Sequence, residues 1–122
     1  MIERCFDAGV ISEILEADAS ALVNDRRNII LISGQDIGAF AWRGPGIYEG
    51  HIHFKSRGAA AFRVAQAMLD GMGEHARMVW GLTPENLRHV RLFNRKCGFV
   101  SQGILDTPEG RCELFVREYL CR

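Results

Sequence analysis

A glutamate and two histidines alternate along a short apolar stretch of this 122-residue chain. Glu49, His51 and His53 lie within residues 47–54, where the alternation of residue types predicts a β-strand. Because successive side chains of a strand point to opposite faces, these three side chains should share one face. A carboxylate or an imidazole placed in this way can act as a general base toward a substrate proton. We therefore take Glu49 and His51 as candidate catalytic residues.

Each of these three residues also has a purely structural explanation. Glu49 can be a solvated strand residue, because charged side chains are mostly exposed. His51 and His53 can be hydrogen-bonded structural histidines, and a His-x-His pair on a strand can also bind a metal ion. The sequence offers no third ligand near the pair, so we predict no metal site.

The turn after this strand, Lys55-Ser-Arg-Gly-Ala-Ala60, has the composition of an anion site. The first backbone N–H groups of a helix have no partners within it, and together with the helix dipole they attract phosphate. Small residues at Gly58, Ala59 and Ala60 would allow close approach, while Lys55 and Arg57 add positive charge. The alternative is an alanine-rich helix packed closely on a sheet and preceded by two solvated cations.

Hydrophobic periodicity predicts the elements that position these residues. A helical pattern covers about residues 7–23, where Asp18 interrupts the apolar face and allows two short helices. Strands are expected over about 28–33, 37–43 and 47–54, with the last two forming an antiparallel hairpin around Gly44-Pro-Gly46. The helix that follows carries one apolar stripe and stops near Gly71 and Gly73. The stripe consists of Ala61, Val64, Ala65, Met68 and Met72.

The second half of the chain predicts a strand, a helix and two further strands. Residues 77–82 form a short apolar strand, which a right-handed crossover would place parallel to the strand at 47–54. Thr83-Pro-Glu85 has the residue types of a helix start, so we expect the next helix to run from there to Cys97 and to stop at Gly98. Strands over 99–106 and 111–120 flank the turn Thr107-Pro-Glu-Gly110. The predicted class is α/β, with a mixed sheet flanked by helices.

Length and composition favour one domain covering residues 1–122. The formal net charge is zero, which argues against a nucleic-acid partner. We expect no signal peptide and no membrane contact, because long apolar runs are missing from the sequence, and therefore a cytoplasmic location. The scattered cysteines, Cys5, Cys97, Cys112 and Cys121, fit reduced thiols better than a disulfide framework or a zinc site.

Two motifs, taken together, resemble those of the GNAT acetyltransferases. The turn reads Lys55-x-x-Gly58-x-Ala60, which is similar to the family's pyrophosphate loop, Gln/Arg-x-x-Gly-x-Gly/Ala. Residues 86–99 are similar to the second signature, Asn-x-x-Ala-x-x-Leu-Tyr-x-Lys-x-Gly-Phe, with small spacing variation. The matching residues are Asn86, Leu92, Gly98 and Phe99, with His89 in the alanine place and Phe93 in the tyrosine place. The resemblance covers about residues 28–119, and the compact form also resembles GNAT-like proteins encoded by phages and prophages.

This resemblance implies a compact GNAT-like fold, with a mixed, mostly antiparallel sheet of about six strands flanked by helices. The short chain suggests that the family's first strand and one early helix are missing. Acetyl-CoA would be the cosubstrate, with its pantetheine arm paired to the splayed strand at 47–54 and its pyrophosphate held by the loop. The implied cofactor-binding residues are Ile52, His53, Phe54, Lys55, Arg57, Gly58, Ala59, Ala60, Asn86 and Phe93.

The function that follows is an acyl-CoA-dependent N-acetyltransferase that moves an acetyl group to an amine on a small molecule or a protein. The alternative is a non-catalytic GNAT-fold binding or phage-associated assembly module, because Phe93 cannot donate the proton that many family members take from a tyrosine. A weaker third reading is a small metal-binding protein built on His51 and His53. A homodimer, in which a partner subunit completes the acceptor side, also remains open.

Several other residues have two readings each. Arg88, Arg91 and Arg95 share one helix side, where they can meet the 3′-phosphate of CoA or simply form a solvated basic face. Met78 and Trp80 can wall the acyl pocket or belong to the core. We interpret Cys97 as a small buried residue rather than a nucleophile.

Overall fold

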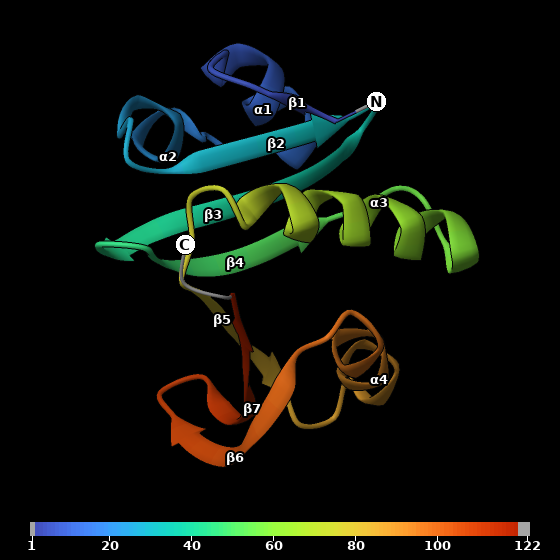
Figure 1. Cartoon of the computed structure of the whole chain (residues 1–122). Coiled ribbons are helices and arrows are strands. Elements are labelled where there is room, and N and C mark those ends of the chain that lie inside the picture. Colours follow the sequence, from blue (N-terminus) through green and yellow to red (C-terminus); the bar gives the residue numbers. More distant parts are fainter. Residues whose placement is uncertain (1, 120–122) are drawn as a thin grey trace.

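The computed structural model describes residues 2–119 (Figure 1). The first half contains β1 (Glu3–Arg4), α1 (Ala8–Leu15), α2 (Ser20–Asn24), β2 (Ile29–Ser33), β3 (Asp36–Gly44) and β4 (Ile47–His53). The second half contains α3 (Gly58–Met72), β5 (Met78–Pro84), α4 (Arg88–Lys96), β6 (Val100–Thr107) and β7 (Gly110–Glu118). Across residues 2–119, we find no helix that is both long and apolar enough to cross a membrane.

All seven strands form one sheet in the order β1-β2-β3-β4-β5-β7-β6. Every neighbouring pair is antiparallel except β4 and β5, which run parallel on either side of the α3 crossover. The predicted hairpin of β3 and β4 and the predicted parallel pair are both confirmed. The parallel pair is therefore the place where an α/β unit is inserted into an otherwise antiparallel sheet.

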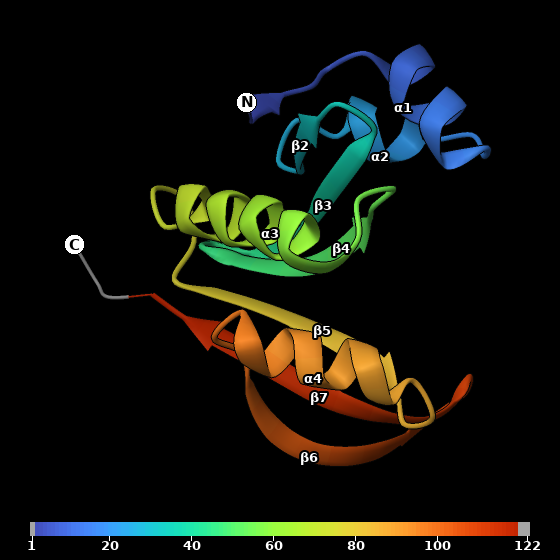
Figure 2. The same ribbon diagram turned by 90° about the vertical axis from the view of Figure 1, so that its right-hand side faces the viewer.

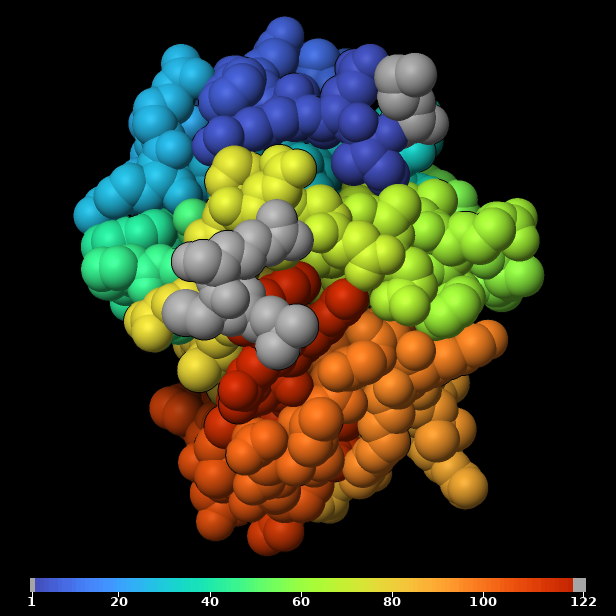
Figure 3. Space-filling view, in the orientation of Figure 1, coloured from blue at the N-terminus to red at the C-terminus, as the bar shows by residue number. Residues whose placement is uncertain are grey.

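Each face of the sheet carries its own hydrophobic cluster. On one face, α1 and α2 pack Ile11, Ala19 and Val23 against Ile30 and Ile37. On the other face, α3 and α4 cover a larger cluster, which we call the α3 cluster. It holds Ile29, Phe40, Tyr48, Ala65, Leu69, Met72, Ala76, Val79 and Cys97. The surfaces of α3 and α4 meet side by side (Figure 3). The sheet thus forms the middle layer between two unequal helical layers.

The predicted stripe on α3 is largely correct. Ala61, Ala65, Met68 and Met72 are buried, whereas Val64 is partly exposed, and Leu69 contributes to the core instead. The division of the first helical segment into α1 and α2 also agrees with the interruption at Asp18.

Three predictions about the elements were wrong. The first strand is present, because Glu3 and Arg4 pair with Ile32 and Leu31 of β2. Both early helices are also present, although α2 has only five residues. The sheet consequently has seven strands rather than about six. A two-residue edge strand carries too few residues to show a period in sequence.

The predicted start of the fourth helix was also wrong. Thr83 and Pro84 continue β5, where they pair with Glu113 and Cys112 of β7, and α4 begins only at Arg88. A proline has no N–H to give to a neighbouring strand, so it is tolerated where one edge of a strand is unpaired. Here β5 has a neighbour on the β7 side and none on the β4 side at Pro84. Tertiary pairing thus overrides a good local helix-start sequence.

Candidate functional site

A fork opens in the middle of the sheet between β4 and β5. The two strands pair through Ile47 with Met78, Tyr48 with Val79, and Glu49 with Trp80, and their pairing goes no further. Both strands continue, β4 on β3 and β5 on β7, so residues 50–53 and 81–84 face each other without pairing (Figure 2). A strand edge with unpaired N–H and C=O groups can accept another extended backbone.

Two glycines lie where the strands separate. A Cβ atom built on Gly81 would lie 3.4 Å from the backbone oxygen of Gly50. A Cβ atom on Gly50 would lie 3.1 Å from Cγ1 of Val79 and 3.5 Å from Cε1 of Phe40. The strands therefore approach so closely at the base of the fork that side chains there would fill it.

A cavity of about 230 Å³ lies at the fork, on the sheet face that α3 and α4 cover. Sheet residues such as Phe40, Ile52 and Trp80 form part of its wall, and Ala65 and Phe93 close it from α3 and α4. Its polar lining includes His51, Thr83 and Asn94, and Asn94 donates a hydrogen bond to the Thr83 hydroxyl at 2.8 Å. The cavity is mostly apolar with a few polar groups, which is typical of a small-ligand site.

The predicted anion turn caps the fork at the start of α3. The N–H groups of Lys55 and Ser56 donate to Oδ1 of Asp36 at 2.8 and 3.0 Å. No hydrogen bond found among residues 2–119 uses the next four amides, which belong to residues 57–60. These exposed amides at a helix N-terminus, beside the exposed Lys55 side chain, meet the requirements of a phosphate site.

Gly58 has a backbone requirement for glycine in addition to the small size expected at a phosphate site. Its φ of +59° lies in the left-handed region, and no heavy atom of the protein lies within 4 Å of a Cβ atom built on it. The position thus favours glycine for its backbone conformation, while close approach of a phosphate stays a prediction. Arg57 also differs from expectation, because its guanidinium donates to the carbonyls of Phe54 and Ser56 at 2.6 and 2.9 Å. The positive charge of Arg57 remains at the loop, but its guanidinium is already bonded to the backbone of the turn.

Asp36 was not identified from the sequence. It is the first residue of β3, it is only 3% exposed, and its carboxylate accepts both loop amides. Burial raises the pKa of Asp36, but hydrogen bonds from Ser56 and Lys55, with the charge of Arg57, outweigh burial and leave that pKa below its ordinary value. A polar residue at the start of a strand gives no sequence signal for a contact with a loop 19 residues away.

Glu49 and His51 lie on the opposite sheet face from the helices α3 and α4. The alternation is as predicted, because Tyr48 packs in the α3 cluster while Glu49 and His51 point the other way. Oε2 of Glu49 contacts Nε2 of His51 at 2.7 Å, and Arg43 contacts the other carboxylate oxygen at 3.0 Å. Of the two candidate bases, His51 lines the cavity and Glu49 does not. Glu49 is therefore placed to orient the imidazole, with Nδ1 left for another partner.

The remaining predicted cofactor residues fall into two groups. Ile52 and Phe93 line the cavity, Phe54 packs against the α3 cluster, and Ala59 and Ala60 are exposed at the helix start. His53 and Asn86 are not among the cavity residues. Nε2 of His53 is buried with no hydrogen-bond partner, and the Asn86 residue is exposed.

The arginines of α4 mostly serve the fold. Arg91 and Arg95 contact the two carboxylate oxygens of Glu113 at 2.5 and 2.6 Å, and Glu113 is 2% exposed. Burial raises the pKa of Glu113, but hydrogen bonds from Ser101 and Arg91 and the two positive charges hold it below its ordinary value. Arg88 is exposed. The helix is thus fixed to β7 by a buried ion cluster rather than offering three cations to a ligand.

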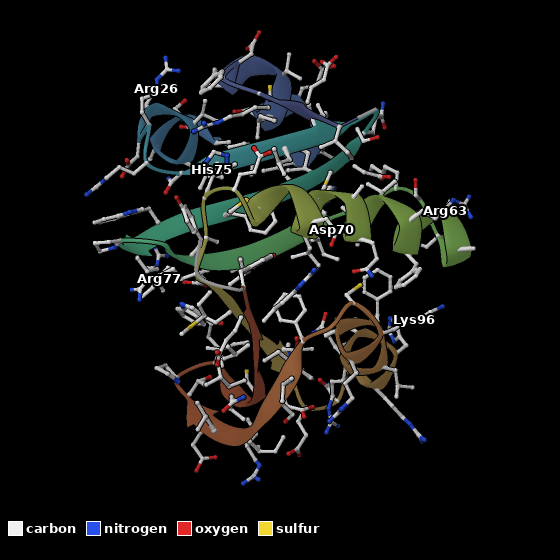
Figure 4. All side chains as sticks on the ribbon, in the orientation of Figure 1. Arg26, Arg63, Asp70, His75, Arg77 and Lys96 are labelled. Atoms are coloured by element: carbon white, nitrogen blue, oxygen red, sulfur yellow. The ribbon has the colours of Figure 1, made fainter. Side chains whose placement is uncertain are left out.

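Two other cations lie on α3 and α4, the helices that cover the cavity. Lys96 of α4 reaches across to α3, with its Nζ atom 4.4 Å from the ring centroid of Phe62. Arg63 is exposed and points away from the molecule near the start of α3 (Figure 4). Lys96 occupies the lysine place of the second signature, two residues before Gly98, whereas Arg63 lies outside both motifs.

Comparison with solved structures decides the fold. A chimera of the Vibrio cholerae spermidine N-acetyltransferase SpeG and hSSAT superposes with a TM-score of 0.79 at 11% identity, covering 97% of this chain and 94% of that chain. The fold is GNAT-like. A Bacillus subtilis acetyltransferase in complex with CoA gives a TM-score of 0.72 at 17% identity, with 98% of each chain covered. No family model and no curated protein sequence matches the chain.

The GNAT-like fold of this chain has no tyrosine at the cavity. The chain contains two tyrosines, Tyr48 and Tyr119, and both pack in or against the α3 cluster away from the cavity lining. The Tyr119 hydroxyl donates to the carbonyl of Leu69 at 2.6 Å, and burial raises its pKa to about 12. Phe93 lines the cavity where the motif would place a tyrosine. No tyrosine from another element therefore lines the cavity.

Cys97, Trp80 and Met78 each had two readings. Cys97 is 2% exposed, and burial raises its pKa to about 11, which agrees with a small core residue rather than a nucleophile. Trp80 lines the cavity, whereas Met78 does not. Among residues 2–119, there is no group of three histidine, cysteine or acidic side chains that could together hold a metal ion.

Proposed function

We propose that this protein is an N-acetyltransferase that uses acetyl-CoA and acetylates an amine. The fork between β4 and β5 carries the proposal, because an unpaired strand edge and an apolar cavity lie there and β4 leads directly to an uncapped helix start. A pantetheine arm can pair with residues 50–53, and a pyrophosphate can receive the amides of residues 57–60. The solved acetyltransferase with CoA and a similar fold supports the same cosubstrate.

The residues at the fork fit such a ligand. The mostly apolar cavity suits a thioester end better than a charged group, and the charged end has the exposed Lys55 and the free amides. When bound, acetyl-CoA would supply an activated acetyl group. Phe93 and Trp80 would exclude water from the reacting carbon, which limits hydrolysis.

His51 is the residue that we assign to proton removal from the amine. The residue borders the cavity, and its side chain, on the opposite face of β4, is 62% exposed and therefore open to an amine that enters from solvent. Glu49, held by Arg43, would keep Nε2 of His51 protonated and leave Nδ1 as the accepting nitrogen. The same proton on His51, or a water molecule, would then reach the departing thiolate, because no tyrosine lines the cavity.

A non-catalytic binding module is the second candidate, and Phe93 favours it. A phenyl ring at the usual tyrosine position cannot protonate a thiolate, so a chain with this residue could bind acyl-CoA without turning it over. The acceptor amine, a phage or prophage relationship, a homodimer and a cytoplasmic location remain predictions from the sequence.

Two measurements separate these possibilities. At CoA concentrations about 100 times the dissociation constant, binding adds about 2.7 kcal/mol to stability. For a domain of this size the melting temperature should then rise by roughly 10 °C. No rise with millimolar CoA or acetyl-CoA, at low and moderate salt, would refute the proposed cosubstrate.

Turnover is measured as free thiol released from acetyl-CoA in the presence of amines, peptides or cell lysate. Release that depends on an added amine supports the enzyme. A protein that binds acetyl-CoA but releases no thiol with any acceptor is the binding module.

A further inference from the structure

Asp36 is one of three buried polar or charged residues that the described chain contains, with Thr83 and Glu113. Thr83 and Glu113 both bind side chains of α4. Asp36 instead binds backbone, because its Oδ1 accepts the amides of Lys55 and Ser56. A carboxylate that is 3% exposed is costly to bury unless hydrogen bonds compensate, so this contact explains why the residue can be there.

The two bonds determine where the loop goes after β4. Ile37 pairs with His53, so Asp36 lies beside the point where β4 ends and the chain turns toward α3. With the first two amides held by Asp36, and with the Arg57 guanidinium on the carbonyls of Phe54 and Ser56, the turn is supported through both its donors and its acceptors. The next four amides, of residues 57–60, are left for a ligand.

We propose that Asp36 is a positioning residue that presets the loop for the pyrophosphate of CoA by holding the amides of Lys55 and Ser56. This inference rests on the proposed function, because it assumes that the loop binds that pyrophosphate. Asp36 does not contact the ligand itself. Its carboxylate is negative and close to an anion site, so electrostatics alone would disfavour it there. Asp36 contributes the two hydrogen bonds that its Oδ1 accepts from the loop amides.

This arrangement makes the oxygen, rather than the charge, the important feature of Asp36. An asparagine at this position keeps an oxygen that can accept both amides and removes the negative charge. An alanine removes the acceptor, leaves two partly buried N–H groups unpaired and frees the turn to move. The alanine variant should therefore lose CoA affinity, whereas the asparagine variant should not.

The test compares CoA with S-acetylpantetheine, which lacks the pyrophosphate, by isothermal titration of the full chain. Asp36→Ala should weaken CoA binding at least tenfold and change S-acetylpantetheine binding less than twofold. Asp36→Asn should keep CoA binding within threefold of the parent or strengthen it. Asp70→Ala is the control, since Asp70 is an exposed carboxylate on α3 whose partner Arg117 lies far from the loop in sequence. It should change neither affinity.

Each failure has its own meaning. Equal weakening of both ligands in Asp36→Ala would show a general loss of structure and overturn the positioning role, as would unchanged CoA binding. A tenfold loss in Asp36→Asn would also overturn it, and this arm stays informative if the alanine variant does not fold. A parent that binds S-acetylpantetheine but not CoA, or neither, would instead refute the proposed function of the loop.

Discussion

Replacing Gly81 with valine is expected to close the fork while leaving the fold intact. Gly81 lines the cavity on β5 and has an ordinary backbone conformation, so a β-branched residue suits its strand. Its Cβ atom would lie 3.4 Å from the oxygen of Gly50, at the margin of ordinary van der Waals contact. The two γ-carbons of valine then have to occupy space between β4 and β5, where we place the pantetheine arm.

The structure sets the size of both effects. Because the Cβ contact is tolerable and a cavity of about 230 Å³ can receive the added carbons, the free energy of unfolding should change by less than about 1 kcal/mol. Loss of the hydrogen bonds along β4 and of the apolar contacts should weaken CoA binding about 100-fold, or about 2.7 kcal/mol. At a CoA concentration that stabilises the parent by about 2.7 kcal/mol, the variant would gain only about 0.4 kcal/mol.

The assay is a thermal melt with and without CoA, combined with urea unfolding of the free proteins. The parent should show a rise of roughly 10 °C with CoA, and Gly81→Val a rise of about 2 °C. Gly71→Ala is the matched control, because Gly71 has open space around its Cβ position and does not line the cavity. A Gly81→Val protein that melts like the parent and shows the full CoA shift would refute a ligand path through the fork.

Four further predictions concern catalysis and stability. His51→Gln should lower amine-dependent thiol release by roughly 100- to 10,000-fold while CoA affinity stays within twofold. Glu49→Gln should lower the release less. Full activity in both variants would refute the assignment of His51 as the base. Phe93→Tyr should increase turnover if protonation of the thiolate limits the rate, whereas an unchanged rate would show that another step does. Gly58→Ala should cost about 1 kcal/mol of stability in urea, because φ is +59° there, and no loss would contradict the backbone assignment. Folding lowers the pKa values of Asp36 and Glu113. The stability that these two carboxylates contribute should therefore be complete above about pH 5 and decline as the pH falls through the lowered values. Glu113→Gln should flatten this decline of stability at acid pH and cost about 2 kcal/mol at neutral pH.

The sequence predicted the middle of the fold well because its periods there are long and unambiguous. The α3 stripe and the β3–β4 hairpin follow from patterns of seven or more residues, and the parallel partner at β5 follows from a short apolar run after the crossover helix. The start of α4 could not be predicted in the same way. Thr83 and Pro84 suit a helix start locally, and only pairing with Glu113 and Cys112, almost 30 residues later, makes them a strand end.

The candidate site shows the same division between local and distant information. The basic turn and the alternation of Glu49 and His51 are local patterns, and both were predictable from residue types. The hydrogen bonds of Asp36 to the loop, and of Arg91 and Arg95 to Glu113, join segments about 20 residues apart. No local pattern contains such contacts, so the residue that supports the loop was missed, and neither reading of Arg91 and Arg95, a phosphate contact or a solvated face, included their ion pairs with Glu113.

The short pairing of β4 with β5 has a consequence for how the molecule moves. Beyond Glu49 and Trp80 the sheet consists of two halves, β1–β4 and β5–β7–β6, that share no ladder. The amides along the inner edges of residues 50–53 and 81–83 should therefore exchange with deuterium well before those of β3 and β7. An extended ligand bound in the fork would act as a short extra strand between the halves. Protection of these edges on adding CoA would show the cosubstrate completing the sheet that the polypeptide alone leaves open.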